Sequence, residues 1–411
     1  MQINADLHIH SKYSMASSRK MELPTIAGEA AKKGINLVGT GDCIHPKWLL
    51  DIKQVAVDDE TVRIDDTYFV LTTEIEDKNR VHHLLILPSI SKAKELAEIM
   101  GKYGNLAVDG RPTVQLDGCS IAEAAKEVGA MIGPAHAFTP WTALYAAHDS
   151  LESCYLDMTD YVSFLELGLS ADTDYADRIK ELHRLTFLSN SDAHSPWPNK
   201  LAREFTRFEV PDITFEGLEK AILRKNGYNA TLNVGFYPQE GKYNRSACIK
   251  CFKEYKLEEC LNRNWRCSCS GRIKKGVYDR INELADFDEP LHPEYRPEYM
   301  HLIPLAEIIM MALGHSSIST QGVQNAWSAL VGKFGSELAV LLNAEPDELR
   351  LVDNKIVDAI LAFRRGHVII HPGGGGRYGW IELPLKNDST KLEPKTKIID
   401  DNKNQSSLLD F

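Results

Sequence analysis

Asp6-Leu7-His8-Ile9-His10 (DLHIH) closes the first apolar stretch of the chain, which begins at Ile3. Polar and apolar residues alternate strictly here, and in a β-strand such alternation places the two kinds on opposite faces. Residues 3–10 are therefore predicted to form a strand with one apolar face and one face that ends in two imidazoles. Because imidazole is a common metal ligand, the stretch predicts both a sheet and a metal site.

Short apolar runs and helical patterns continue to alternate over the first 230 residues. The predicted strands are 3–10, 35–42, 67–76, 81–88, 130–138, 162–168, 186–194 and 203–210. Helical periodicity appears at 23–34, 91–104, 120–129, 174–185 and 214–227. This alternation indicates an α/β protein with βαβ units and a largely parallel sheet. Seven or eight such strands fit a closed barrel better than a small open sheet.

Carboxylates and imidazoles gather at the ends of these strands. They are His8, His10, Asp42, His45, Glu74, His82, His83, His136, Asp192 and His194. A single histidine often only satisfies a buried hydrogen bond, but the strand ends of an α/β barrel converge on one rim, where catalytic residues lie. This ligand set suits divalent metals such as Zn²⁺, Mn²⁺ or Mg²⁺, and it exceeds what one ion needs. We expect two or three ions, and therefore hydrolysis of a phosphoester.

Composition limits the classes of protein to which the chain can belong. The 411 residues suffice for two or three domains, and 43% hydrophobic with 26% charged residues is ordinary for a globular protein. Residues 1–4 lead directly into the first strand without a signal-like run, and the most apolar stretch, 302–313, is too short to span a bilayer. We expect a cytoplasmic protein with no membrane partner. The net charge of −11 argues against a protein that coats nucleic acid over its whole surface.

Five of the eight cysteines fall within residues 248–269. In a cytoplasmic protein such a cluster indicates metal binding rather than disulfides. Cys248 and Cys251 form a Cys-x-x-Cys pair, and Cys267 and Cys269 follow as a Cys-x-Cys pair. Cys260 is a possible substitute for one of the four, and incidental cysteines are the alternative. We predict a structural Zn²⁺ site in a module that spans residues 242–282.

This module is basic within an acidic chain. Residues 242–280 hold eleven Lys and Arg against four Asp and Glu, a net charge of +7. The excess suits a nucleic-acid backbone, although a solvated basic face would have the same composition. The residues predicted to contact DNA are Lys250, Arg266, Arg272, Lys274, Lys275, Arg377 and Tyr378. The last two lie in the Gly-rich stretch 371–379, which can equally be a plain turn and lacks the Gly-Lys ending of a P-loop.

Helical patterns return in residues 300–366, and residues 283–385 are predicted to form a helical, DNA-binding region that includes the Gly-rich loop. Residues 386–411 are polar, charged and interrupted by Pro394, which predicts a disordered tail. The tail nevertheless ends in Gln405-x-x-Leu408-x-x-Phe411. This spacing matches the short motif that binds the sliding clamp PCNA, in which an aliphatic and an aromatic residue fill an apolar pocket.

With these residues identified, residues 1–235 resemble a polymerase-and-histidinol-phosphatase (PHP) domain. The resemblance implies a distorted (β/α)7 barrel with a trinuclear metal site. The matches to the family motifs are His8, His10, Asp42, Glu74, one of His82 or His83, His136, Asp192 and His194. The second family motif commonly ends in histidine where this chain has Cys43, so His45 or Cys43 is left as the alternative ligand.

The order of PHP domain, zinc module, helical region and clamp motif resembles endonuclease Q, a DNA-repair family of archaea and some bacteria. The likeness runs through stretches such as GTGDCIHPKWL, VHHLLILP, RIKKGVYDR and PGGGGRYG. It implies a metal-dependent endodeoxyribonuclease that nicks double- or single-stranded DNA 5′ of an abasic site or a deaminated base (uracil, hypoxanthine or xanthine). The catalytic residues would be His8, His10, Glu74, Asp192 and His194. A PHP phosphatase for a small phosphomonoester and a non-catalytic DNA or clamp adaptor remain as alternatives.

Overall fold

The computed structural model describes residues 1–384 and 397–398, and the chain divides into two compact units. The first unit comprises residues 1–31, 35–235 and 283–302. The second comprises residues 32–34, 236–282 and the described residues from 303 onward. Residues 283–302, which the sequence pattern assigned to the helical region, thus belong to the first unit. No helix in the described part of the chain is both long and apolar enough to cross a membrane.

The first unit is built on a mixed sheet with the strand order β13-β10-β9-β1-β2-β4-β5-β6 and with β3 paired to β4. Its strands are β1 (Gln2–Asp6), β2 (Leu37–Gly39), β3 (Val62–Ile64), β4 (Thr67–Glu76), β5 (His82–Leu87), β6 (Met131–Pro134), β9 (Phe205–Glu209), β10 (Asn229–Gly235) and β13 (Glu298–His301). A separate parallel pair is formed by β7 (Phe164–Glu166) and β8 (Thr186–Leu188).

Backbone contacts join this sheet to the β7–β8 pair and close a distorted barrel in the order β1-β2-β4-β5-β6-β7-β8. The N–H of Ser163 donates to the carbonyl of Ile132 in β6, and a bridge pairs Ile9 with Ala193 beyond β8. The prediction of an α/β fold with a distorted barrel is therefore confirmed. The prediction of a largely parallel sheet is wrong, because β5 runs antiparallel to both β4 and β6. The connection 77–81 is too short for the crossover that a parallel pair requires.

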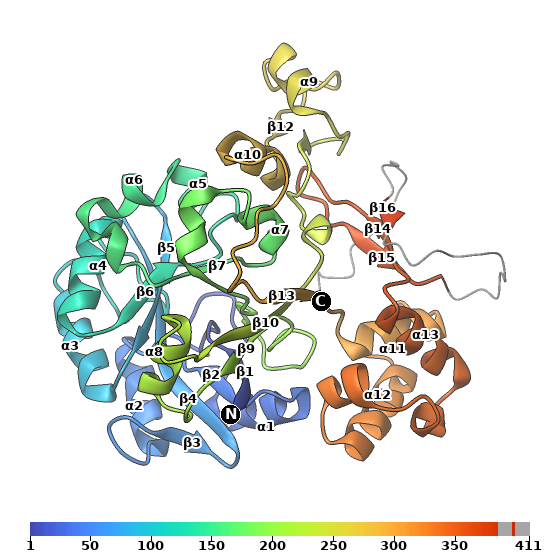
Figure 1. Ribbon diagram of the computed structural model, residues 1–411, viewed down its shortest axis with the longest axis horizontal. Coiled ribbons are helices and arrows are strands. Elements are labelled where there is room, and N and C mark those ends of the chain that lie inside the picture. Colours follow the sequence, from blue (N-terminus) through green and yellow to red (C-terminus); the bar gives the residue numbers. More distant parts are fainter. Residues whose placement is uncertain (385–396, 399–411) are drawn as a thin grey trace. The chain divides into compact units, whose positions relative to one another are not determined.

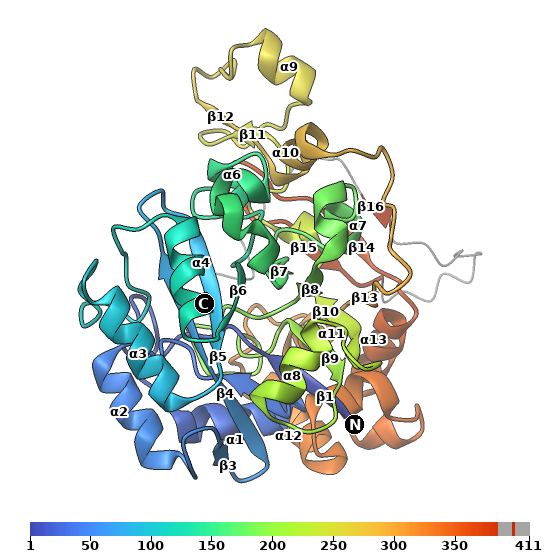
Figure 2. The ribbon, with the colours of Figure 1, turned by 60° about the vertical axis from the view of Figure 1, so that its left-hand side comes forward.

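Helices of the first unit fill the connections between strands, and Figures 1 and 2 show α2, α3 and α4 along the outer side of β4 and β5. They are α1 (Leu23–Lys33), α2 (Pro46–Val55), α3 (Ile90–Met100), α4 (Gly118–Glu127), α5 (Leu144–Ala147), α6 (Leu151–Tyr155), α7 (Thr173–Ala176) and α8 (Phe215–Ile222). The last two residues of α1 fall in the second unit. The helix predicted over 174–185 is split into α7 and a 3₁₀ turn at Lys180–Arg184. Between them Asp177 is fully buried and accepts hydrogen bonds from Nε and Nη2 of Arg296.

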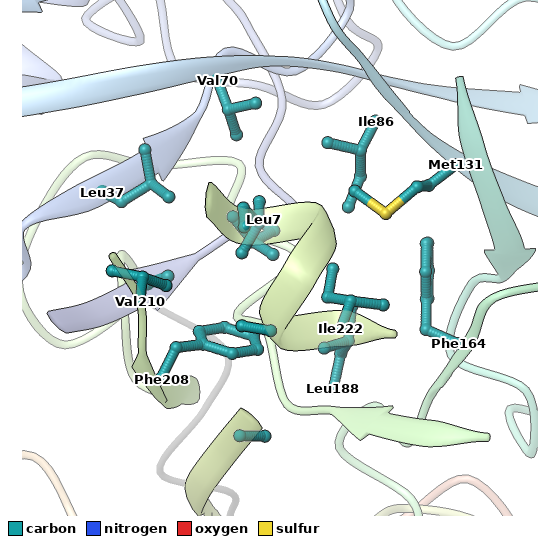
Figure 3. Close-up of a cluster of buried hydrophobic side chains, with 14 of the residues drawn as sticks. Leu7, Leu37, Val70, Ile86, Met131, Phe164, Leu188, Phe208, Val210 and Ile222 are labelled. Carbon is teal, nitrogen blue, oxygen red and sulfur yellow. The ribbon is translucent and has the colours of Figure 1, made fainter. Parts of the chain in front are cut away.

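Apolar side chains from successive strands meet in one buried cluster, which Figure 3 shows in close-up. Leu7, Val70, Ile86 and Phe164 point into it from different strands or their extensions. Fully burying one such side chain contributes roughly 1.5–3 kcal/mol, so the cluster holds the strands firmly in register. Leu7 lies between Asp6 and His8, and its burial here leaves the polar face of DLHIH for the rim.

The second unit contains a small hairpin, a group of helices and a second small sheet. Its elements are β11 (Ala247–Cys248), α9 (Leu257–Asn262), β12 (Ile273–Lys274), α10 (Val277–Leu284), α11 (Leu305–Leu313), α12 (Gln321–Phe334), α13 (Asn354–Arg364), β14 (Ile369–His371), β15 (Trp380–Glu382) and β16 (Lys397–Ile398). The final residues of α10 fall in the first unit. The predicted helical region is confirmed by α11, α12 and α13.

Candidate metal centre and zinc module

Seven of the residues predicted as ligands lie together at the barrel rim. They form three groups, in each of which one ligand atom per residue lies within 4.8 Å of the others. The groups are His8–His10–Glu74, His10–Asp192–His194 and Glu74–His82–His136. Since His10 and Glu74 each belong to two groups, the three groups form one continuous centre, which we call the rim centre.

Glu74, near the end of β4, lies at the middle of the rim centre and is almost fully buried. Its Oε1 is 2.7 Å from His82 Nδ1 and 2.9 Å from His136 Nε2. Its Oε2 is 3.3 Å from His10 Nε2 and 3.7 Å from His8 Nε2. Each oxygen therefore faces a different group, so Glu74 would contribute a ligand atom to both of them.

Two further carboxylates hold the histidines of DLHIH in place, each through the Nδ1 atom of one ring. His8 Nδ1 lies 2.8 Å from Glu166 Oε2, and His10 Nδ1 lies 3.1 Å from Asp42 Oδ1. Asp42 is itself fixed by the N–H of Ser11 at 2.6 Å. A carboxylate on one ring nitrogen orients the ring and leaves the other nitrogen for a metal. Both histidines thus present Nε2 toward the rim centre.

Several buried atoms of the rim centre have no hydrogen-bond partner among the described residues: His8 Nε2, His10 Nε2, His136 Nδ1 and Asp192 Oδ1. Buried polar atoms are nearly always paired, so such a gathering requires a physical reason. His10 Nε2 and Asp192 Oδ1 lie only 3.1 Å apart without hydrogen-bond geometry. Nitrogen and oxygen donors of this kind fit borderline divalent cations such as Zn²⁺ and Mn²⁺.

The electrostatics of the rim centre favour positive charge. Burial opposes charging of His8, but Glu166 and Glu74 outweigh burial and raise the pKa of His8 well above its usual value. Burial likewise favours the neutral form of Glu74, but His82 and His8 prevail and hold its pKa well below its usual value. A pocket that attracts protons to imidazoles and keeps its glutamate ionised also attracts metal cations.

Three residues around the rim centre have backbone conformations that are rare outside glycine. The φ angles are 50° at Asp42, 30° at His136 and 48° at Asp192. Non-glycine residues in this left-handed region carry local strain and cluster at functional sites. The strain is tolerated because the surrounding barrel fixes these turns at the strand ends.

Four candidate ligands lie outside the three groups: Asp42, His45, its alternative Cys43, and His83. Asp42 stands behind His10, as described above. His45 accepts a hydrogen bond from the N–H of Trp48 at the start of α2 and stacks on Tyr13, with 4.7 Å between ring centroids. Cys43, the alternative to His45, is fully buried, which raises the pKa of its thiol well above the usual value and disfavours the thiolate.

His82 and His83 are adjacent in β5 and therefore point to opposite faces of the strand. His82 joins Glu74 in the rim centre, whereas His83 Nδ1 lies 2.8 Å from the hydroxyl of Tyr155. Of this pair the structure brings only His82 to the other ligands. Asp6, from the same face as His8, accepts hydrogen bonds from Ser191 and Ala202 instead.

Two residues of the rim were missed in the sequence. Glu166 ends β7, so the rule that polar residues at strand ends mark the rim applied to it as well. Arg111 lies in the loop before α4, and its Nη1 is 3.3 Å from Glu74 Oε2. No pattern in the sequence distinguishes this arginine, because a loop has no periodicity that assigns its side chains to a face.

Four thiols of the predicted zinc module meet in the second unit, in the segment drawn in yellow in Figure 1. Cys248 Sγ lies 3.5 Å from Cys269 Sγ, and Cys251 Sγ lies 3.5 Å from Cys267 Sγ. Zn–S bonds of about 2.3 Å in a tetrahedron separate sulfurs by about 3.8 Å, so the four thiols fit Zn²⁺. Cys260 is not in this group and packs in a small apolar cluster with Tyr255 and Ile273.

Each cysteine pair sits on a tight turn that supplies N–H groups to sulfur. The N–H of Lys250 points at Cys248 Sγ at 3.4 Å, and that of Cys269 at Cys267 Sγ at 3.5 Å. A hydrogen bond from the Tyr255 hydroxyl and the N–H of Cys269 lower the pKa of Cys267 to about 5, which favours the thiolate that Zn²⁺ binds. A Cβ on Gly271 would lie 2.5 Å from Cys248 Sγ, so only glycine fits beside this site.

The residues predicted to contact DNA are at least partly accessible. Lys250, Arg266 and Arg272 are exposed, and Lys274, Lys275, Arg377 and Tyr378 are half-buried. The guanidinium of Arg377 lies 6.0 Å from the ring of Phe252, an exposed aromatic on the first cysteine turn.

The Gly-rich loop packs against the residues just before this turn. The N–H groups of Gly373, Gly376 and Gly379 donate to the carbonyls of Gln239, Lys242 and Glu240. These amides are therefore occupied within the chain and are not donors for a ligand. Gln405, Leu408 and Phe411 of the predicted clamp motif lie outside the described residues.

Comparison with known proteins gives one family. The family model of the MJ0043 C-terminal domain matches residues 304–367. The uncharacterized protein MJ0043 of Methanocaldococcus jannaschii is 47% identical over 252 residues, which are 60% of this chain and 31% of that protein. The chain thus spans less than a third of that relative.

Two solved structures match almost the whole chain. A crystal structure of the lesion-specific endonuclease PfuEndoQ from Pyrococcus furiosus is 47% identical, with a TM-score of 0.90 and coverage of 95% of this chain and 98% of that one. An endonuclease Q complex with a 27-mer duplex that has an abasic lesion at the active site is 46% identical, with a TM-score of 0.88 and coverage of 95% and 100%. Because these two matches cover both units of the chain, the chain belongs to the endonuclease Q family.

Proposed function

We propose that this chain is a metal-dependent DNA-repair endonuclease that nicks one strand immediately 5′ of a deaminated base (uracil, hypoxanthine or xanthine) or an abasic site. The rim centre carries the proposal, because its three linked groups leave buried donor atoms facing one another without partners. DNA as the substrate is supported by the endonuclease Q complex with a duplex that has an abasic lesion at the active site. The intact ligand set argues against a non-catalytic adaptor.

The reaction is hydrolysis of a phosphodiester. Water adds to the phosphorus, and the P–O3′ bond breaks, which leaves a 3′-hydroxyl on one side and a 5′-phosphate on the side of the lesion. Divalent ions, when bound, activate water and neutralise the charge that develops on the phosphate. The residues proposed to hold them are His8, His10, Glu74, His82, His136, Asp192 and His194. Glu166 and Asp42 keep the rings of His8 and His10 in position.

The two units would have different roles in the reaction, one in binding DNA and the other in cleaving it. The basic side chains of the zinc module and of residues 377–378 would bind the phosphate backbone, which gives affinity without sequence preference. The target nucleotide must leave the base stack to reach the rim centre. Leaving the stack costs least for an abasic or weakly paired nucleotide, and this difference contributes to selectivity for lesions.

We also propose that Gln405, Leu408 and Phe411 bind the sliding clamp PCNA. The spacing of these residues supports this proposal, because it is that of a short motif whose aliphatic and aromatic side chains fill an apolar pocket of the partner. Deleting residues 405–411 is expected to remove binding to purified PCNA and to leave nicking of free DNA unchanged. Clamp binding that survives the deletion would contradict the proposal.

The test of the main proposal uses labelled duplexes with one deoxyuridine, deoxyinosine or abasic site, beside an undamaged duplex. The chain is incubated with each duplex and Mg²⁺ or Mn²⁺, and the products are sized. We expect a single cut just 5′ of the lesion, absent from the undamaged duplex and from the Asp192→Ala protein. Rapid hydrolysis of a small phosphomonoester without any cut in the duplexes would favour the phosphatase alternative instead.

A further inference from the structure

Arg111 places a positive charge directly on the rim centre. Its Nη1 lies 3.3 Å from Glu74 Oε2, the oxygen that also faces His8 and His10. The side chain is 28% exposed, so it has access to a ligand that arrives from solvent. A cation beside metal ligands weakens metal binding by repulsion, so its presence there needs an explanation other than metal affinity.

The chain holds Arg111 in place from its N-terminal side. Asp109 Oδ1 accepts the N–H of Arg111 at 3.1 Å and the N–H of Met15 at 3.2 Å. The N–H of Gly110 donates to the carbonyl of Tyr13. A Cβ on Gly110 would lie 2.2 Å from Asp42 Oδ2, so the backbone here lies closely against the residue that orients His10.

The C-terminal side is fixed as firmly, to the end of the strand that carries Glu74. The carbonyl of Pro112 accepts the N–H of Glu76, and the N–H of Val114 donates to the carbonyl of Glu76. Thr113 Oγ1 adds a hydrogen bond of 3.0 Å to Glu76 Oε1. Arg111 is therefore tied both to the strand that carries Glu74 and to the loop after DLHIH, and the guanidinium is aimed at the rim centre by the fold.

The chemistry of a guanidinium specifies the ligand. Arginine stays charged at all relevant pH values and presents a planar fork of donors that matches two oxygens of a phosphate. With divalent ions bound, Glu74 would share its negative charge with them and would hold the guanidinium less strongly, so that an anion entering the centre would take the place of Glu74 at Arg111. The ligand would then be the phosphodiester anion itself.

On this geometry we propose that Arg111 binds a non-bridging oxygen of the scissile phosphate and stabilises the charge that grows there as water adds. The proposal rests on the proposed function and names one more residue that touches the substrate. Arg111 transfers no proton, because its guanidinium stays charged at all relevant pH values. The alternative is that Arg111 only pairs with Glu74 and supports the metal ligands.

The test compares Arg111→Met and Arg111→Lys with Arg63→Met. Arg63 is an exposed arginine of β3 that pairs with Asp66. Three quantities are measured: metal bound per chain, kcat and KM on both a deoxyuridine duplex and bis(p-nitrophenyl) phosphate, and the Kd of inorganic phosphate for the metal-loaded protein. We expect Arg111→Met to keep its metal and to lose kcat about 100-fold or more on both substrates. Its phosphate affinity should fall about tenfold or more, with partial recovery in Arg111→Lys.

Two results would overturn the proposal. If Arg111→Met loses bound metal, Arg111 serves Glu74 rather than the substrate. If metal, kcat and phosphate affinity all match those of Arg63→Met, Arg111 has no role in the reaction. A wild-type protein that hydrolyses bis(p-nitrophenyl) phosphate but leaves lesion duplexes intact would refute only the DNA-repair function, because the loss in Arg111→Met on the small diester would still support the phosphate contact.

Discussion

The rim centre and the zinc module both present ligands for metal, but their surroundings are opposite. His8, His10 and Glu74 are almost fully buried at the end of a barrel with its own large apolar cluster. Cys251 is exposed, and the apolar cluster of the zinc module is small and partly made of the cysteines themselves. In the barrel the fold positions the ligands and metal adds chemistry, whereas in the module metal is expected to hold the fold together. Substitutions in the two regions should therefore fail in different ways.

The largest effect is expected for Asp192→Ala in the rim centre. Loss of this carboxylate should lower nicking by at least about a thousandfold, because removing a group from a set that acts as a unit disables the whole set. The apolar cluster stays intact, so the thermal melting curve by circular dichroism should remain cooperative and close to that of the wild type. An unfolded Asp192→Ala protein would contradict the idea that the fold, not the metal, positions this site.

Cys267→Ser should show the opposite behaviour. Without its fourth thiolate the module should lose its Zn²⁺ and its structure, since such sites contribute about 10–16 kcal/mol to the folding of small metal-dependent domains. We expect zinc content to fall by one ion per chain and DNA affinity to fall, while hydrolysis of bis(p-nitrophenyl) phosphate stays unchanged. Cys260→Ser is the matched control and should keep its zinc, because Cys260 is outside the group of four.

Glu166→Gln tests how the barrel orients a ligand without removing one. The amide keeps the size of the side chain but loses the charge next to His8 Nδ1, and losses of this kind cost about 10–100-fold in metal affinity or activity. Titration of metal-depleted protein with Mn²⁺ measures the change. Glu95→Gln, at a half-buried residue paired with Lys92, controls for charge alone. Equal affinities in the two variants would remove Glu166 from the site.

The smallest effect is expected for Arg272→Ala on the exposed face of the zinc module. One phosphate contact should be lost, so binding should weaken about equally for all DNA sequences, and the slope of log affinity against log salt should fall by about 1. Fluorescence anisotropy with duplexes of different sequence, at several salt concentrations, measures both quantities. A sequence-dependent loss would indicate a base contact instead.

The sequence predicted the barrel and most of the rim centre because strands have a period of two. That period assigns His8 and His10 to one face of DLHIH, and the convergence of strand ends in a barrel brings Glu74, His136 and Asp192 to them. It cannot choose between His82 and His83 without knowing which face of β5 is turned to the rim. It also cannot separate Asp42, which stands behind His10, from a residue that touches metal.

Features that depend on loops and on pairing between distant segments could not be predicted from the sequence. Arg111 is aimed by hydrogen bonds to segments distant in the chain, and β13 pairs with β10 across more than 60 residues. The Gly-rich stretch resembles a ligand loop in composition, yet its amides bond to residues 239–242. Composition alone does not distinguish glycines that approach a ligand from glycines that approach another part of the backbone.

Anomalous X-ray scattering from crystals grown with Mn²⁺ would test the central claim most directly. The expected result is two or three manganese peaks among His8, Glu74, His136 and Asp192, and a separate zinc peak within bonding distance of Cys248, Cys251, Cys267 and Cys269. A zinc peak at the cysteines without any peak in the barrel would contradict a metal-dependent centre at the rim.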